Sequence, residues 1–201
     1  MKSLKESLFD RDLISKDIKF KFAGLEINPM PVIYKRGKFQ FADSWDELSY
    51  KKACGLKEGS TYFSWDDCHD IKIGQWRVPT EREWEKIINR GIDTYDFFVV
   101  DSIPYQVIYP DNYEIEIVRS KNISKEQLDK FCSRGCLPIP FTGFYFSIAK
   151  KWRDKGLYGD LWTSTASQKL ETAYYAMLSE RGIRVLSFNK DLPYFPVLLV
   201  K

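Results

Sequence analysis

This chain of 201 residues has one histidine, no long apolar run and little excess of either charge. The one His, His69, would have to serve any serine nucleophile that needs a histidine base. No apolar stretch approaches the roughly 20 residues of a membrane-spanning helix. The charged N-terminus also lacks the apolar segment of a signal peptide. We therefore expect no membrane span, a cytoplasmic location and reduced cysteines.

The charges of the chain are close to balance. The 31 Lys and Arg residues exceed the 28 Asp and Glu residues by only three, and no basic run stands out. Nucleic-acid-binding proteins usually carry a basic patch or stripe, so we expect no nucleic-acid partner. Hydrophobic residues make up 44% of the chain and aromatic residues 16%, which is enough to build a packed core.

The chain is organised as an arm followed by one domain. Residues 1–19 mix charged and apolar side chains without a clean period, which is typical of an N-terminal arm or leader. Residues 20–201 contain no repeat, low-complexity tract or long linker. We interpret them as a single α+β domain.

Helix signals lie mainly between residues 44 and 133. A Ser or Thr followed three positions later by an acidic residue or Gln is typical of a helix N-terminus. Four such pairs are present: Ser44 with Glu47, Ser64 with Asp67, Thr80 with Glu83, and Ser124 with Gln127. We expect the first of these helices to end at Gly55 and the third at Gly91.

Strand signals occupy most of the remaining chain. Residues 35–38 predict a hairpin turn in which Gly37 takes the left-handed conformation. Residues 174–188 predict a second hairpin that turns at residues 179–182. A final strand should return over residues 195–201, with Phe195, Val197 and Leu199 on one face. Pro193 and Pro196 mark this strand as an edge or a bulge. Ile115 and Ile117, which alternate with glutamates, predict another half-buried strand.

Several motifs occur in a defined order from residue 62 to the C-terminus. Residues 74–84 read GQWRVPTEREW, residues 161–165 read LWTST, and residues 173–175 read AYY. This order resembles the formylglycine-generating sulfatase-modifying family and a set of bacterial paralogous domains, both of which are similar to the C-type lectin fold. The resemblance implies a C-type-lectin-like α+β fold, with twisted antiparallel sheets and a few short helices.

The residues that carry this resemblance are expected to be structural. They are Trp76, Arg77, Pro79, Thr80, Glu83, Trp84, Trp162, Ser164 and Thr165. We expect the three tryptophans to be buried in the core. We expect Arg77 to clamp a carboxylate among Glu81, Glu83 and Glu85, since Arg–carboxylate pairs are often bidentate.

Catalytic and metal sites find little support in the sequence. The formylglycine-generating family implies a late pair of copper-binding cysteines, and no Cys follows Cys136. Cys68, His69, Cys132 and Cys136 are four residues of the kinds that zinc prefers, but their spacing is irregular. The carboxylates of Asp66, Asp67 and Asp70 form the other candidate site. We expect no metal or cofactor, and a metal-dependent enzyme or oxidase stays open as the alternative.

A binding surface is the interpretation that we favour. The resemblance implies that ligands meet the final sheet and its loops, as in phage receptor-binding and retroelement-diversified proteins of similar fold. The candidate contacts are Trp152, Arg181, Arg184, Asn189, Lys190, Asp191 and Tyr194. We therefore expect a non-catalytic protein that binds a protein or glycan, with a phage, prophage or virion-associated role as one setting.

Overall fold

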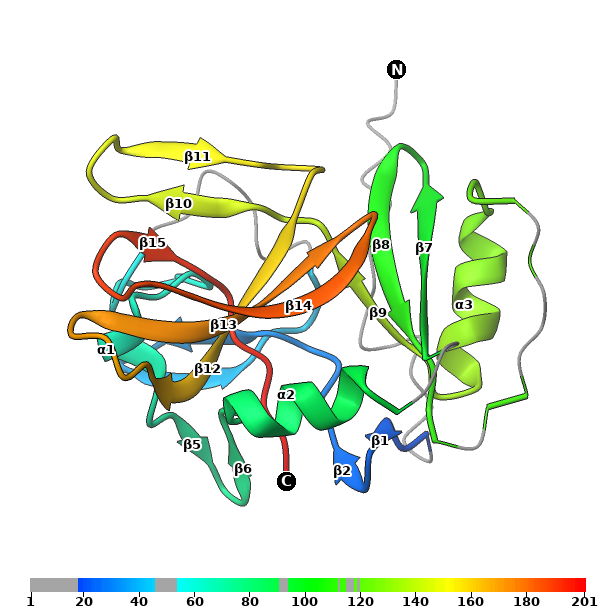
Figure 1. Ribbon diagram of the computed structural model, residues 1–201, viewed down its shortest axis with the longest axis horizontal. Coiled ribbons are helices and arrows are strands. Elements are labelled where there is room, and N and C mark those ends of the chain that lie inside the picture. Colours follow the sequence, from blue (N-terminus) through cyan, green and yellow to red (C-terminus); the bar gives the residue numbers. More distant parts are fainter. Residues whose placement is uncertain (1–17, 46–53, 91–93, 112, 115–117, 119) are drawn as a thin grey trace.

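A computed structural model describes residues 18–45, 54–90, 94–111, 113–114, 118 and 120–201 (Figure 1). The described part consists mostly of small antiparallel sheets with a few short helices, which agrees with the α+β class. The helices are α1 (Trp65–Cys68), α2 (Glu81–Ile88) and α3 (Lys125–Ser133). The strands are β1 (Lys21–Phe22), β2 (Leu25–Glu26), β3 (Val32–Lys35), β4 (Lys38–Phe41), β5 (Lys72–Ile73), β6 (Trp76–Arg77), β7 (Tyr95–Val100), β8 (Ile103–Ile108), β9 (Leu137–Pro140), β10 (Phe144–Phe146), β11 (Lys151–Arg153), β12 (Gly159–Ala166), β13 (Thr172–Ser179), β14 (Gly182–Asn189) and β15 (Pro193–Tyr194). No described helix is both long and apolar enough to cross a membrane.

Three of the four predicted helix starts are described, and all three are confirmed. Thr80 and Ser124 each form a complete capping box, and Ser64 accepts a hydrogen bond from the Asp67 backbone. These caps satisfy backbone N–H groups that have no partner inside the helix. α2 ends at Ile88 with Asn89 as its cap, before the predicted stop.

Other predicted features lie outside the described residues. These are the arm over residues 1–17, the body of the helix expected after Ser44, Gly91, and the strand expected at Ile115 and Ile117.

The sheet β12–β13–β14 lies in the middle of the molecule. β13 pairs with β14 along its whole length, from Thr172 opposite Asn189 to Ser179 opposite Gly182. This confirms the predicted hairpin. One face of the sheet is covered by α2, where Trp84 and Ile87 pack in the same buried cluster as Leu161, Ala176 and Leu178 (Figure 1).

The C-terminal segment packs on the opposite face of this sheet. Phe195, Val197 and Leu199 are buried in one cluster with Trp162 and Tyr175, as predicted for one face of the last strand. The intervening residues Leu198 and Val200 are also buried, but in the first cluster. The segment therefore lies between two apolar layers, which explains its continuous apolar sequence.

The strand predicted over residues 195–201, marked as an edge or a bulge by Pro193 and Pro196, does not form a continuous ladder. The only regular strand here is β15, which precedes that range, and single bridges then join Phe195 to Phe63 and Val200 to Ile27 and Arg77. Pro196 interrupts the ladder because it has no N–H to donate. The segment thus changes partner along its length.

A second layered unit consists of the sheet β7–β8–β9 and α3 (Figure 1). Phe98 of β7 stacks on Phe131 of α3, with ring centroids 5.3 Å apart. A third sheet has the order β11–β10–β15, with Tyr145 paired to both Trp152 and Tyr194. The hairpin β3–β4 turns at Arg36 and Gly37, both at positive φ, which confirms the left-handed Gly37.

The three signature tryptophans are not equally buried. Trp84 and Trp162 lie in the core, with 1% and 0% of their surface exposed. Trp76 is only partly buried, so the prediction that it is a core residue is wrong. It lies on the short hairpin β5–β6, where Phe41 covers one side and the Lys201 ammonium lies 4.7 Å from its ring. A two-stranded hairpin has no second layer to enclose the indole completely.

Candidate functional site

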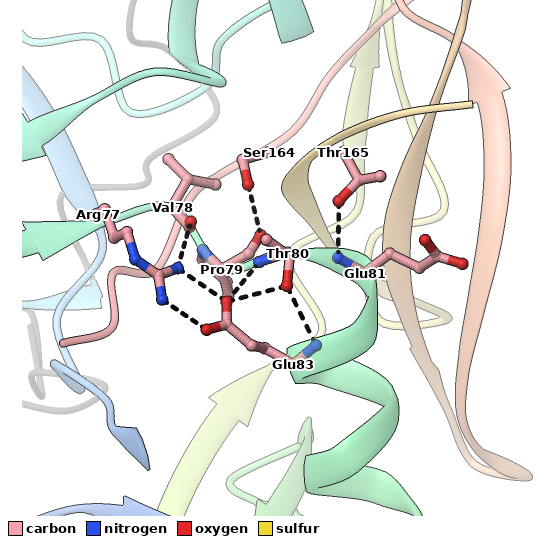
Figure 2. A network of polar contacts seen from close by, with 8 residues as sticks. All are labelled: Arg77, Val78, Pro79, Thr80, Glu81, Glu83, Ser164 and Thr165. Atoms are coloured by element: carbon pink, nitrogen blue, oxygen red, sulfur yellow. Dashed lines mark hydrogen bonds and ion pairs between the residues drawn. The ribbon is translucent and has the colours of Figure 1, made fainter. Parts of the chain in front are cut away.

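The 74–84 motif forms a closed polar network at the start of α2 (Figure 2). The Arg77 guanidinium donates to both carboxylate oxygens of Glu83, with 2.8 Å from Nη1 to Oε2. The same Oε2 accepts from the Thr80 backbone N–H at 2.8 Å. These hydrogen bonds lower the pKa of Glu83 to about 2, and the bonds from Arg77 contribute most. Of the three glutamates considered for the clamp, the structure selects the one that also closes the capping box.

The LWTST motif completes this network from the side of the sheet. The ladder between β12 and β13 is irregular between Trp162 and Ala166, which is typical of a β-bulge. There the Thr165 hydroxyl accepts from the Glu81 backbone N–H at 3.0 Å, and the Ser164 hydroxyl donates to the Pro79 carbonyl at 3.4 Å (Figure 2). The Ser164 backbone N–H donates to the same carbonyl at 2.8 Å. These hydroxyl-bearing residues therefore join β12 to α2 and have structural roles.

The candidate zinc ligands are not brought together. Cys68 lies in the buried cluster around Trp162, whereas Cys132 and Cys136 lie in the other buried cluster. His69 stacks on Trp65 with ring centroids 4.1 Å apart. Within the described ranges, no three His, Cys, Asp or Glu side chains are grouped to hold a metal ion. Burial also raises the pKa of Cys136 to about 12, which disfavours the thiolate that metals and electrophiles require.

The predicted binding residues fall at two separate ends of the β13–β14 hairpin. Asn189, Lys190, Asp191 and Tyr194 lie where β14 leads into β15, whereas Arg181 lies in the turn at the other end. Eight residues of strand separate the ends, which is about 25 Å at the usual rise per residue. The structure therefore does not support a single surface formed by all of them. Arg184 lies between the two ends and is exposed.

The first three residues of this group form a turn. The Asn189 side-chain oxygen accepts from the Asp191 backbone N–H at 2.9 Å. The Lys190 ammonium lies 3.2 Å from Asp66 Oδ1 and 5.7 Å from the centre of the Trp65 ring. Asp66, one of the three carboxylates named above as the other candidate site, thus forms an ion pair with Lys190. These contacts fix the path of the chain from β14 to β15.

Tyr194 and Trp152 both line a pocket of about 370 Å³ beside the sheet β11–β10–β15. Tyr145, on the central strand of this sheet, contacts both rings edge to face, at centroid distances of 5.3 Å to Trp152 and 6.0 Å to Tyr194. Lys57 and Lys150 also line the pocket. Neither lysine forms an ion pair with another described residue. We name Tyr145, Trp152, Tyr194, Lys57 and Lys150 the aromatic pocket.

Sequence reasoning identified two members of the aromatic pocket and missed the others. Tyr145 could have been found from the alternation of residues 144–146, since a strand in this position places its middle residue opposite Trp152. Lys57 comes from a loop almost one hundred residues away, and no local pattern connects it to Trp152. Another residue that was missed is Asp160 of β12, which is 3% exposed. Burial, with a smaller effect from Asp154, raises the pKa of Asp160 to about 8.

Comparisons with known proteins do not assign this chain to a family. No protein-family model matches it, and neither a curated protein nor a solved structure shows significant similarity.

Proposed function

We propose that this is a non-catalytic binding protein whose ligand enters the aromatic pocket. The observation that carries the proposal is the convergence of three aromatic rings from one small sheet with two lysines that form no ion pair with any described residue. Aromatic side chains contribute a large contact area at a low entropic cost, and they dominate the energetics of binding sites. Two lysine ammonium groups at the same pocket favour a ligand that carries negative charge.

The ligand class that fits is an anionic protein segment or an anionic glycan. Both can place flat or apolar surface against Trp152 and Tyr194 while an acidic group meets Lys57 or Lys150. The Cys54 thiol also lines the pocket, and its pKa is raised to about 11, mainly by burial. It stays protonated at neutral pH, so it supports a binding role rather than nucleophilic chemistry.

The motif resemblance supports the same proposal from another direction. We retain the C-type-lectin-like fold as part of it, because the motifs of that resemblance take structural roles at the start of α2 and on β12. A ligand site on the late strands, and a phage, prophage or virion-associated role in contact with a host, follow from that resemblance as proposals. A cytoplasmic location is likewise kept as a proposal.

The test measures direct binding of two defined probes, a sulfated oligosaccharide and a ten-residue polyglutamate peptide. We expect the wild-type protein to bind at least one of them. We expect Tyr194→Ala and Lys150→Ala each to weaken that binding by about tenfold or more. Leu170→Ala, at a side chain that is 94% exposed and lies away from the pocket, is the matched control. Failure of both probes to bind, or equal binding by all the variants, would contradict the proposal.

A further inference from the structure

A second pocket lies at the opposite end of the β13–β14 hairpin. It has a volume of about 360 Å³ and is lined by β7, β8, the turn from Glu180 to Gly182, and Val118, Ser120 and Lys121. Gly182 brings the turn close to β7, because a Cβ at this position would lie 2.8 Å from the Tyr95 hydroxyl oxygen. Its φ of +116° also favours glycine. The close approach of turn and sheet is therefore built into the sequence.

Gln106 gives this pocket an unsatisfied polar group. It lies on β8, the central strand of its sheet, opposite Phe97 on one side and Ile139 on the other. Only 1% of its surface is exposed, and Oε1 has no hydrogen-bond partner among the residues that the structure describes. A buried polar group without a partner costs roughly 1–3 kcal/mol of stability. A leucine of similar size would avoid that cost.

Arg181 gives the same pocket a cation that is not neutralised. Four charged residues line the pocket: Asp96, Lys121, Glu180 and Arg181. Lys121 and Glu180 pair with each other, with 2.8 Å between Nζ and Oε1. Asp96 accepts a hydrogen bond from the Tyr109 hydroxyl at 2.8 Å. Arg181 forms no ion pair with any residue that the structure describes.

We propose that this second pocket binds a small carboxylate that also carries a hydrogen-bond donor, with the carboxylate at Arg181 and the donor at Gln106 Oε1. A guanidinium can grip a carboxylate through two parallel hydrogen bonds. A ligand hydroxyl or amino group would supply the donor that the Gln106 amide lacks. The volume of the pocket suits a ligand of monosaccharide or amino-acid size. The proposal goes beyond the aromatic pocket and is independent of it.

Calorimetric titration with four defined probes tests both halves of the proposed chemistry. Acetate has the carboxylate without a donor, and D-glucose has donors without the carboxylate. D-glucuronate and L-serine have both, and they represent the two sources of such a ligand, sugar acids and amino acids. We expect one of the last two to bind at least tenfold more tightly than acetate and glucose. Equal or undetectable binding of all four probes would overturn the proposal.

Three variants assign the binding to this pocket. Arg181→Ala should weaken binding of the preferred probe by tenfold to a hundredfold, as expected for a charged hydrogen-bonded contact. Gln106→Leu should weaken it by about tenfold while the protein remains fully folded. Arg184→Ala, an exposed arginine on the same hairpin outside the pocket, should bind normally. Loss of binding in Arg184→Ala but not in Arg181→Ala would place the site elsewhere.

Discussion

The start of α2 and the second pocket are two polar regions that differ in whether their polar and charged groups have partners. At α2, both Glu83 carboxylate oxygens accept hydrogen bonds from Arg77, and the cap residue Thr80 closes the network. In the pocket, the Gln106 oxygen and the Arg181 guanidinium have no such partners among the described residues. A satisfied network stabilises the fold by itself, whereas a buried oxygen without a partner, such as Gln106 Oε1, lowers stability until a donor pairs with it. The motif with the strongest sequence signal is therefore structural, and both proposed binding sites lie elsewhere in the molecule.

The largest effect should come from the buried core cluster around Trp162. Trp162→Ala removes a fully buried indole whose Nε1 donates to the Phe63 carbonyl at 2.9 Å. We expect the free energy of unfolding to fall by about 3–5 kcal/mol, measured by urea denaturation. Trp76→Ala is the comparison, since it removes a partly buried indole and should cost less. An equal loss of unfolding free energy in both variants would contradict the smaller contribution expected of Trp76.

A smaller effect should appear in the pH dependence of stability, through Asp160. The folded protein raises the pKa of this carboxyl from 3.8 to about 8, mainly by burial. The folded state therefore binds the proton more tightly than the unfolded state, so the contribution is fully present below pH 4 and is lost as the pH rises towards 8. We expect wild-type stability to fall by roughly 2–4 kcal/mol over this range.

Asp160→Asn provides the control for that pH dependence. The variant keeps the size of the side chain and cannot ionise, so its stability should stay nearly constant between pH 4 and 8. Thermal unfolding at several pH values compares the two proteins. Parallel curves for wild type and variant would show that Asp160 does not titrate as expected.

The closed network at α2 should show the opposite pH dependence. The Glu83 pKa is lowered to about 2, chiefly by its hydrogen bonds with Arg77, so its contribution is present above pH 4.5 and is lost as the pH falls towards 2. Arg77 has a side chain that is 42% exposed, and solvent screening reduces the effect. We expect Glu83→Gln to cost about 1–2 kcal/mol at pH 7. A variant as stable as wild type at pH 7 would contradict the structural role of the motif.

The sequence predicted the local structure well because its signals there are short in range. Capping pairs such as Thr80 with Glu83 involve residues three positions apart, and the β13–β14 hairpin depends on a single turn. The final segment was predicted less well, because its partners Ile27, Phe63 and Arg77 are distant in the chain. The burial of Trp76 was overestimated because the residues that pack against it, Phe41 and Lys201, are also distant in the chain.

The candidate sites were predicted only in part. The sequence favoured the late turns as a single surface, and the structure separates Arg181 from Tyr194 at the two ends of one hairpin. Gln106 gave no signal, since a glutamine in an apolar strand looks like an outward-facing residue until the sheet is seen to be covered on both sides. Recognising it requires the knowledge that its oxygen is buried without a partner.

The most direct test of this comparison is the urea unfolding of Glu83→Gln and Gln106→Leu, measured side by side at pH 7 without ligand. Both variants remove one polar group of similar size, but only Glu83 has hydrogen-bond partners to lose. We expect Glu83→Gln to lose about 1–2 kcal/mol and Gln106→Leu to match wild type or exceed it. If Gln106→Leu is destabilised as much as Glu83→Gln, then Gln106 has a structural role, and the distinction between the two regions is wrong.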